Sequence, residues 1–210
     1  MGRGWSCRWR IDLSFSALRP NASAIAEEIA AAARLPLARA RFLSLGSDPE
    51  HRPTLPFGFV LDHSRTLLGR GEAAFEAAKE AFRRWRMFDL GWVRVANSEV
   101  PIAPGRIVAV EVRALGLWSV NLSQIIETID LQTRFGFIYS TTRSHVEEGE
   151  ERFLLEHDRI TDEVVYGLEA VSRPRALLAR LGLPVTRHFQ HRFARDSHRR
   201  MGKEVGANCG

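Results

Sequence analysis

The chain has 210 residues, of which 45% are hydrophobic, and it carries a formal net charge of +5. These values fit one globular domain with an appendage. No apolar run approaches the roughly 18 residues of a membrane-spanning helix, and the first residues lack the apolar core of a secretory signal, so we expect a cytoplasmic protein. The two cysteines, Cys7 and Cys209, lie near opposite ends of the chain. Their spacing predicts neither a disulfide framework nor a metal site, and no motif indicates a cofactor.

The first 56 residues differ in composition from the rest. They contain an alanine-rich helical stretch, with Asn21 or Ser23 as its candidate N-cap, and then a segment rich in glycine and proline. Because this part holds too few large apolar residues for a core of its own, we expect it to pack on the main body or to stay partly mobile. The sequence therefore predicts a helical extension and linker over 1–56, a main domain over 57–205 and a flexible tail over 206–210.

A short strand and an amphipathic helix open the main domain. We expect the strand near residues 57–69 and the helix near residues 71–86. Four apolar residues of the helix fall at helical spacing and predict one buried face: Phe75, Ala78, Phe82 and Trp85.

Five further segments alternate with the period of two that is typical of strands. They cover residues 106–113, 117–128, 134–141, 152–158 and 163–172. Connections this short require antiparallel neighbours. In the second segment we assign to the inner face of the sheet the row Trp118, Val120, Leu122, Gln124 and Ile126. In the third and fifth segments the inner rows contain Phe137, Tyr139 and Tyr166.

The last long element is expected to cover the apolar face of this sheet. It begins at Pro174, is interrupted at residues 182–184, and resumes with Val185, Phe189 and Phe193 on one side. The sequence thus predicts an α+β fold in which a curved antiparallel sheet of about seven strands grips a long C-terminal helix. This order of elements resembles the helix-grip fold of the START and birch-pollen-allergen superfamily.

Several local motifs between Phe57 and about Val205 point to a narrower resemblance. They are GFVLDHSRTLLGRGEAAFEAAKEAFRRWRMFDLGWVRV, the PG at 104–105, FGFIYSTTRSHVEEGEERF, SRP at 172–174 and LPVTRHFQHRFARDS. Together they resemble domain-of-unknown-function family nineteen-ninety, also called uncharacterised protein family 0548. The resemblance implies the fold and candidate positions, but it implies no activity.

The central motif of that family runs FG-x-x-x-GTL-x-GH-x-x-x-GEE-x-F. This chain matches it at His145, Gly149, Glu150, Glu151 and Phe153. It departs from the motif where serine or threonine replaces the expected residue, at Ser140, Thr142 and Ser144.

The matching histidine and glutamates are the candidate catalytic residues. His145 with Glu150 or Glu151 would supply a general acid and base at the rim of the sheet. One of the two glutamates must point inward if a strand has begun there. We expect it to pair with Arg173 or with an arginine of the terminal helix, as a clamp between sheet and helix. For Glu147 and Glu148 we favour a solvated hairpin loop that turns at Gly149.

Three polar residues interrupt the apolar inner face: Gln124, Tyr139 and Tyr166. They would orient a ligand in a cavity, or they would bond to each other or to trapped water in a closed core. The candidate ligand-binding residues are Trp118, Gln124, Phe137, Tyr139, Tyr166, Arg173 and Gln190.

The sequence leaves three functions open. The leading hypothesis is a domain that binds a small hydrophobic or amphipathic molecule between the sheet and the C-terminal helix. The second is an enzyme of hydrolase, cyclase or isomerase type that uses His145 with Glu150 or Glu151. The third is contact with nucleic acid or an anionic membrane through the basic residues 187–203, which we instead favour as the solvated face of a helix. The oligomeric state also stays open.

Overall fold

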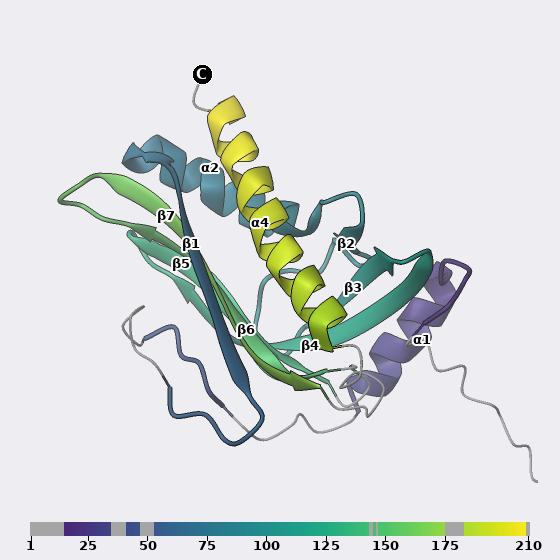
Figure 1. Cartoon of the computed structure of the whole chain (residues 1–210). Coiled ribbons are helices and arrows are strands. Elements are labelled where there is room, and N and C mark those ends of the chain that lie inside the picture. The colour runs from purple at the N-terminus through teal and green to yellow at the C-terminus, as the bar shows by residue number, and fades with distance from the viewer. Residues whose placement is uncertain are drawn as a thin grey trace, which may run out of the picture.

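The structure, a computed structural model, describes residues 15–34, 41–46, 53–142, 145, 147–174 and 183–208 (Figure 1). Its helices are α1 (Ala22–Ala32), α2 (Gly71–Arg83), the short 3₁₀ helix η1 (Arg86–Phe88) and α4 (Leu183–Asn208). Its strands are β1 (Val60–Arg70), β2 (Val93–Val95), β3 (Ile107–Ala114), β4 (Leu117–Asp130), β5 (Arg134–Thr141), β6 (Glu147–His157) and β7 (Glu163–Pro174).

The seven strands form one antiparallel sheet in the order β1-β7-β6-β5-β4-β3-β2. The sheet curves around α4, which runs across its concave side (Figure 1). Short connections enforce the antiparallel pairing. Between β3 and β4, for example, the chain turns at Leu115 and Gly116, which both have positive φ, as a tight hairpin turn requires. The predicted α+β helix-grip fold is confirmed.

The concave, inner face of the sheet is closed by α2, η1 and α4. Phe82 of α2 meets the ring of Tyr166 edge-on at 5.3 Å between centroids, and Phe137 stacks on Phe153 at 4.8 Å. Such aromatic contacts stabilise a core beyond the burial of apolar area alone. The predicted buried face of α2 is confirmed at Phe75, Ala78 and Phe82. Trp85 is buried too, but it lies beyond the end of α2, where its positive φ ends the helix earlier than predicted.

The convex, outer face is covered by α1 where β3 and β4 pair. The helix begins at Asn21, whose side-chain oxygen accepts the N–H of Ala24 at 2.9 Å, so one of the two predicted N-caps is confirmed. Ile25 of α1 packs against Val120 and Leu122 of β4. Both faces of β4 are therefore covered around Val120 and Leu122.

A second part of the outer face is covered by residues 41–46, which we call the arm. Two leucines of the arm, Leu43 and Leu45, pack on Ile138 and Leu154 of the sheet. The described N-terminal residues thus lie on the outside of the sheet, on the side opposite to α4.

Carboxylates on the outer face bind the main chain of the arm. Glu150 Oε2 accepts the N–H groups of Phe42 and Leu43 at 2.9 and 3.1 Å. Glu127 Oε1 accepts the N–H of Leu45 at 2.8 Å. Because main-chain groups that lose their partners in a buried place are costly, these bonds fix the arm to the sheet.

We expect Glu150→Ala to lower the free energy of unfolding by about 1 to 3 kcal/mol, because it leaves a buried and a half-buried N–H group without an acceptor. Glu148→Ala is a matched control on the same strand and face, since it removes only a half-exposed pair with Arg173. That control should cost less than about 1 kcal/mol. Urea titration measures both values, and equal losses would contradict the assigned role of Glu150.

The inner face of β4 is the reverse of the one that we predicted. Ser123 pairs with Val108 and Asn121 pairs with Val110, and both valines belong to the inner core. Residues opposite each other in a ladder share a face. The row that we assigned to the inner face therefore points outward: Trp118, Val120, Leu122, Gln124 and Ile126. The alternation of the two rows was predicted correctly. The assignment to faces was wrong because α1 packs on the outer row, which is therefore the more apolar of the two.

The C-terminal helix also differs from the prediction. Pro174, where we expected it to begin, is the last residue of β7, and α4 begins at Leu183 after a stretch outside the described residues. The helix continues to Asn208, into the segment that we predicted to be a tail. In the part of the chain that the structure describes, no helix is both long and apolar enough to cross a membrane.

Candidate functional site

A tyrosine and a glutamate form a polar pair on the inner face of the sheet. Tyr139 of β5 lies opposite Glu151 of β6, and its hydroxyl donates to Glu151 Oε2 at 2.7 Å. The surroundings of the pair are aromatic, because the rings of Phe153 and Phe88 lie 5.4 and 6.5 Å from the ring of Tyr139. Phe193 of α4 in turn lies 5.3 Å from Phe88. The pair is thus a polar group in an apolar wall.

The electrostatics of this pair place a titration near neutral pH. Burial raises the pKa of Glu151 to about 7, although the hydrogen bond from Tyr139 lowers it and the charges of Glu147 and Asp62 raise it further. Burial, together with the charge of Glu151, raises the pKa of Tyr139 well above its ordinary value. Near pH 7, Glu151 can therefore take up or release a proton, while Tyr139 remains a hydrogen-bond donor.

Polar contacts join α4 to the sheet beside this pair. Gln190 Nε2 donates to Glu147 Oε2 at 3.1 Å and to Ser172 Oγ at 3.2 Å. Arg187 Nη1 donates to Asp62 Oδ2 at 2.7 Å. Burial raises the pKa of Glu147, and the bond from Gln190 opposes that rise. These contacts position the N-terminal half of α4 over the inner face.

Hydroxyl and amide groups extend the polar part of the inner face along β4 and β5. Ser119, Asn121 and Ser123 of β4 share the inner face with Thr141 of β5. Thr141 Oγ1 accepts the N–H of Gly149 at 3.0 Å. Sequence reasoning missed this row, although the alternation of β4 contained it as the row opposite to the one that we chose.

Several side chains around the pair of Tyr139 and Glu151 are only partly buried. Glu151, Asn121, Gln190 and Phe193 are all half-buried, although they come from β6, β4 and α4, which face the same interior. α4 packs against α2, η1, β1 and β7. Each of these four side chains keeps part of its surface exposed. An apolar wall with a few convergent polar groups is the usual character of a small-molecule site.

Two of the predicted ligand-binding residues lie in the closed part of the core. Phe137 and Tyr166 are fully buried on the inner face. The Tyr166 hydroxyl is 2.9 Å from Ser197 Oγ of α4, and the ring of His198 lies 5.0 Å from its ring. Of the other predicted ligand-binding residues, Gln190 is half-buried beside the inner face, and Tyr139 is buried on it with 5% of its surface exposed.

Three other predicted ligand-binding residues lie on the outer face, which corrects their expected position. Trp118 lies beneath the guanidinium groups of Arg19 and Arg113, at 5.4 and 5.7 Å from its ring centroid. Gln124 Nε2 donates to the carbonyl of Gly105 at 2.9 Å. Arg173 binds Glu148 of the neighbouring strand at 2.8 Å.

The predicted catalytic trio is divided by the sheet. Glu150 faces outward and binds the arm, whereas Glu151 faces inward. His145 accepts the N–H of Glu147 through Nδ1 at 3.0 Å. The predicted solvated loop is also corrected, because Glu147, Glu148 and Gly149 already belong to β6. The predicted clamp is wrong, because Glu150 binds the arm, Glu151 binds Tyr139 and Arg173 binds Glu148. A different contact, between Glu147 and Gln190, joins the sheet to the helix.

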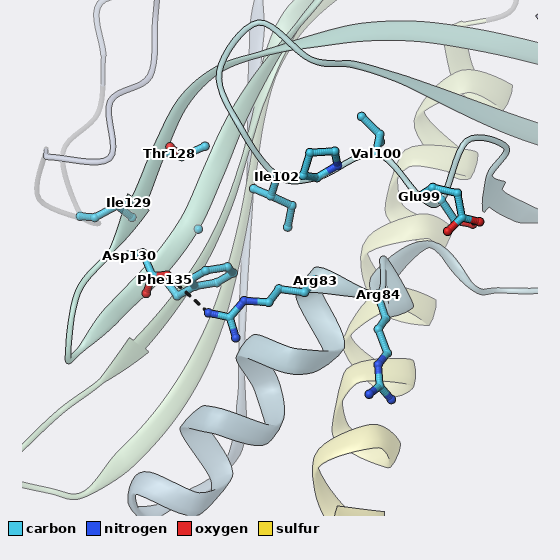
Figure 2. A pocket seen from close by; sticks show the side chains of 12 residues that line it. Arg83, Arg84, Glu99, Val100, Ile102, Thr128, Ile129, Asp130 and Phe135 are labelled. Carbon is cyan, nitrogen blue, oxygen red and sulfur yellow. Dashed lines mark hydrogen bonds and ion pairs between the residues drawn. The ribbon is translucent and has the colours of Figure 1, made fainter. Parts of the chain in front are cut away.

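A hollow of about 630 Å³ lies at another place, between the end of α2, the loop 98–102 and the ends of β4 and β5 (Figure 2). We call it the edge hollow. Its walls include Arg83, Val100, Ile102 and Phe135. Of the described residues that we predicted to contact a ligand, none lines it.

The arginines of α4 are paired with acidic side chains. Arg187 binds Asp62, and Arg200 binds Asp89 and Glu204, each at 2.7 to 2.8 Å. A single aspartate, Asp196, lies within 3.4 to 3.9 Å of Arg192, Arg195 and Arg199. Much of the positive charge that the sequence concentrates here is therefore met within the molecule. Within the described residues, no group of three or more histidine, cysteine or acidic side chains could hold a metal ion.

We expect Glu151→Gln to remove part of the pH dependence of stability. A carboxyl whose pKa is raised from 4.5 to about 7 on folding stabilises the fold below pH 4.5, and this contribution is lost as the pH rises through 7. Between pH 5 and 8, the free energy of unfolding should fall by on the order of 2 kcal/mol more in the wild-type protein than in the variant. Urea titrations at both pH values test this, and equal falls would contradict it.

Comparison with known sequences identifies relatives over most of the chain. The profile of a family described as "Domain of unknown function (DUF1990)" matches residues 46–200. A UPF0548 protein of Dictyostelium discoideum is 37% identical over 161 residues, which are 71% of this chain and 74% of the relative. A UPF0548 protein of Deinococcus radiodurans is 33% identical over 153 residues, which are 68% of this chain and 76% of the relative.

Solved structures with similar folds are more distant in sequence. The protein Ara h 8.0201 is 14% identical with a TM-score of 0.47, over 71% of this chain and 99% of its own. A norcoclaurine synthase from Thalictrum is 8% identical with a TM-score of 0.48, over 75% of this chain and 100% of its own.

Proposed function

We propose that this chain, which belongs to the DUF1990 family, binds one small amphipathic molecule between the inner face of its sheet and the N-terminal half of α4. The observation that supports this most is the pair of Tyr139 and Glu151, a hydrogen-bonded polar group set in an aromatic wall, in which Tyr139 is buried and Glu151 is half-buried. A closed core has no need of a carboxyl group there, because burying it costs free energy.

The residues around the pair suggest how such a molecule would lie. Its apolar part would contact the half-buried Phe193, whose ring lies 6.5 Å from that of the fully buried Phe153. Its polar part would meet Glu151 and Tyr139, and the row of hydroxyl and amide groups on β4 that includes Asn121. Few polar groups in an apolar site fix orientation and supply specificity.

Native mass spectrometry of gently purified protein tests this proposal. We expect a fraction of the wild-type protein to carry one bound molecule that denaturation releases. Asn121→Trp, which would fill the space in front of β4, should lack it. Leu115→Trp at the exposed turn of the same hairpin is the matched control and should keep it. A wild-type protein that carries no molecule, and that also fails to bind a neutral amphipathic probe, would contradict the proposal.

A second candidate function is supported by the pKa of Glu151. A carboxyl that titrates at about 7 is suited to act as a general acid or base at neutral pH. In this alternative the protein is an isomerase or cyclase that moves a proton on the bound molecule, with Glu151 as the acid or base and Tyr139 as the donor that orients it.

The two candidates differ in what Glu151→Gln does. If the protein is an enzyme, the variant should still bind the molecule released from the wild-type protein, but it should convert none of it in a single-turnover assay followed by mass spectrometry. Tyr139→Phe should slow conversion by about 10-fold to 100-fold, as expected for loss of one positioned donor. If the wild-type protein returns the molecule unchanged, binding alone is the function.

A further inference from the structure

The long strand β4 loses one of its two neighbours halfway along its length. It pairs with β3 only as far as Gln124, whereas it pairs with β5 as far as Asp130. The last main-chain contacts on the β3 side are those of Ile125, whose N–H donates to Arg106 and whose carbonyl accepts from Gly105. Within the described stretch 53–142, residues 126–130 of β4 therefore have no strand partner on that side.

This unpaired edge lies in the wall of the edge hollow. Thr128, Ile129 and Asp130 stand on one side of the hollow, and Val100 and Ile102 stand on the other (Figure 2). The loop that contains the latter two residues thus faces the edge without pairing with it. The distance between loop and strand leaves the volume of about 630 Å³, which is in the range of ligand-binding sites.

The unpaired main-chain groups of a free strand edge indicate what kind of molecule would bind there. Unpaired N–H and C=O groups repeat at regular intervals along an edge, and natural proteins usually cover such an edge because it pairs readily with another chain. An extended polypeptide supplies complementary groups at the same intervals, and its alternate side chains point to one face. Here that face contains Phe135 and Ile102, which favours apolar side chains.

The shape of the hollow selects a single strand over a second sheet. The loop 98–102 closes the side opposite to β4, and Arg83 of α2 reaches Asp130 at 3.4 Å across one end. Because the loop 98–102 lies opposite the free edge, we take the occupant to be one extended segment and not the sheet of a second copy of this chain. The occupant is therefore a segment of about five residues, matching the length of the free edge.

We propose that the edge hollow binds an extended segment of a partner polypeptide, which pairs with residues 126–130 of β4 as an added strand. This site is separate from the inner face where we place the small molecule. It would give the protein a peptide-binding function that does not depend on the small molecule.

Hydrogen-exchange mass spectrometry of the full chain tests the proposal. The probe is an equimolar pool of capped pentapeptides with valine, isoleucine, threonine, serine or tyrosine at each position, present at 1 mM. We expect exchange of the amides in residues 126–130 to slow at least ~10-fold when the pool is added. No slowing in that segment would overturn the proposal.

Two modified pools separate strand pairing from simple occupancy by apolar groups. One is methylated at the peptide nitrogens of the second and fourth residues, and the other at those of the first, third and fifth residues. Because an added strand pairs through one edge only, one modified pool should lose its effect and the other should keep it. Equal behaviour of the two pools would overturn the proposal.

A protein variant locates the binding. Ile102→Trp fills the hollow and should abolish the slowing, whereas Leu131→Trp, an exposed position next to the hollow, should leave it unchanged. Both variants must keep the melting temperature of the wild-type protein. If Ile102→Trp lowers it, Ile102→Arg is the second variant. Slowing that persists when the hollow is filled would place the peptide elsewhere and overturn the proposal.

Discussion

Arg152→Ala is expected to lower the free energy of unfolding by about 3 to 5 kcal/mol. Arg152 and Glu169 form a buried ion pair on the outer face, with Nη2 and Oε2 2.6 Å apart and only 4% and 5% of the two side chains exposed. Removal of the arginine leaves a carboxylate buried without its main partner. It also removes the bond from Nη1 to the carbonyl of Ser44, at 2.7 Å, so the arm should loosen as well.

Chemical denaturation measures the loss of unfolding free energy in Arg152→Ala. A double variant shows whether the loss comes from the unpaired buried carboxylate. Arg152→Met combined with Glu169→Leu removes both charges and keeps apolar volume, so it should recover most of the stability. Arm loosening is read from faster hydrogen exchange at Leu45 in the single variant. A loss below about 1 kcal/mol for Arg152→Ala would contradict a buried, energetically coupled pair.

Gly149→Ala is the second change with a large expected effect, about 3 kcal/mol or more. A Cβ atom at this position would lie 2.0 Å from the carbonyl oxygen of Val171 and 2.8 Å from the Cα of Ser172. Both obstacles are main-chain atoms of β7, so β6 and β7 would have to separate. Gly149 is therefore required for the close approach of two strands, and the turn that we predicted there is wrong.

Gly167→Ala is the matched control for this prediction. Gly167 lies on β7, and its added Cβ would meet no atom closer than 3.8 Å. We expect its unfolding free energy to stay within about 1 kcal/mol of the wild-type value, measured by the same urea titration. If the two alanine variants lose similar stability, steric conflict between β6 and β7 is not what distinguishes them.

The sequence predicted the fold because its strongest signals are local. The helical spacing of Phe75, Ala78 and Phe82 and the period of two in the strands are set by backbone geometry, and both are confirmed. Short connections then leave antiparallel pairing as the simplest topology. The fold class and the approximate number of strands follow from these signals without knowledge of tertiary contacts.

The site was harder to predict because it depends on which face of each strand points inward. The rule that the apolar row faces the core assumes that only one face is covered. Here α1 covers Val120 and Leu122 from outside, so the more apolar row of β4 is the outer one. Gln124 and Trp118 were misplaced for this reason, whereas Tyr139 lies on a strand whose inner row was assigned correctly.

The different roles of the neighbouring residues Glu150 and Glu151 could be assigned only from the structure. Glu150 and Glu151 are adjacent, so a strand must send them to opposite faces. The sequence predicts that one of them points inward, but not which one. The structure assigns Glu150 to the main chain of the arm and Glu151 to Tyr139. The partner of Glu150 lies about a hundred residues away, beyond the reach of any local pattern.

Titration of the protein with N-phenyl-1-naphthylamine, a neutral amphipathic fluorescent probe, tests the central claim most directly. We predict that the wild-type protein binds one probe molecule with a Kd on the order of micromolar, equivalent to about 8 kcal/mol. Asn121→Trp should weaken this binding at least ~10-fold while Leu115→Trp does not, because only the former adds a large side chain to the inner face of β4. No binding to the wild-type protein, or equal binding to both variants, would contradict a ligand site between the inner face and α4.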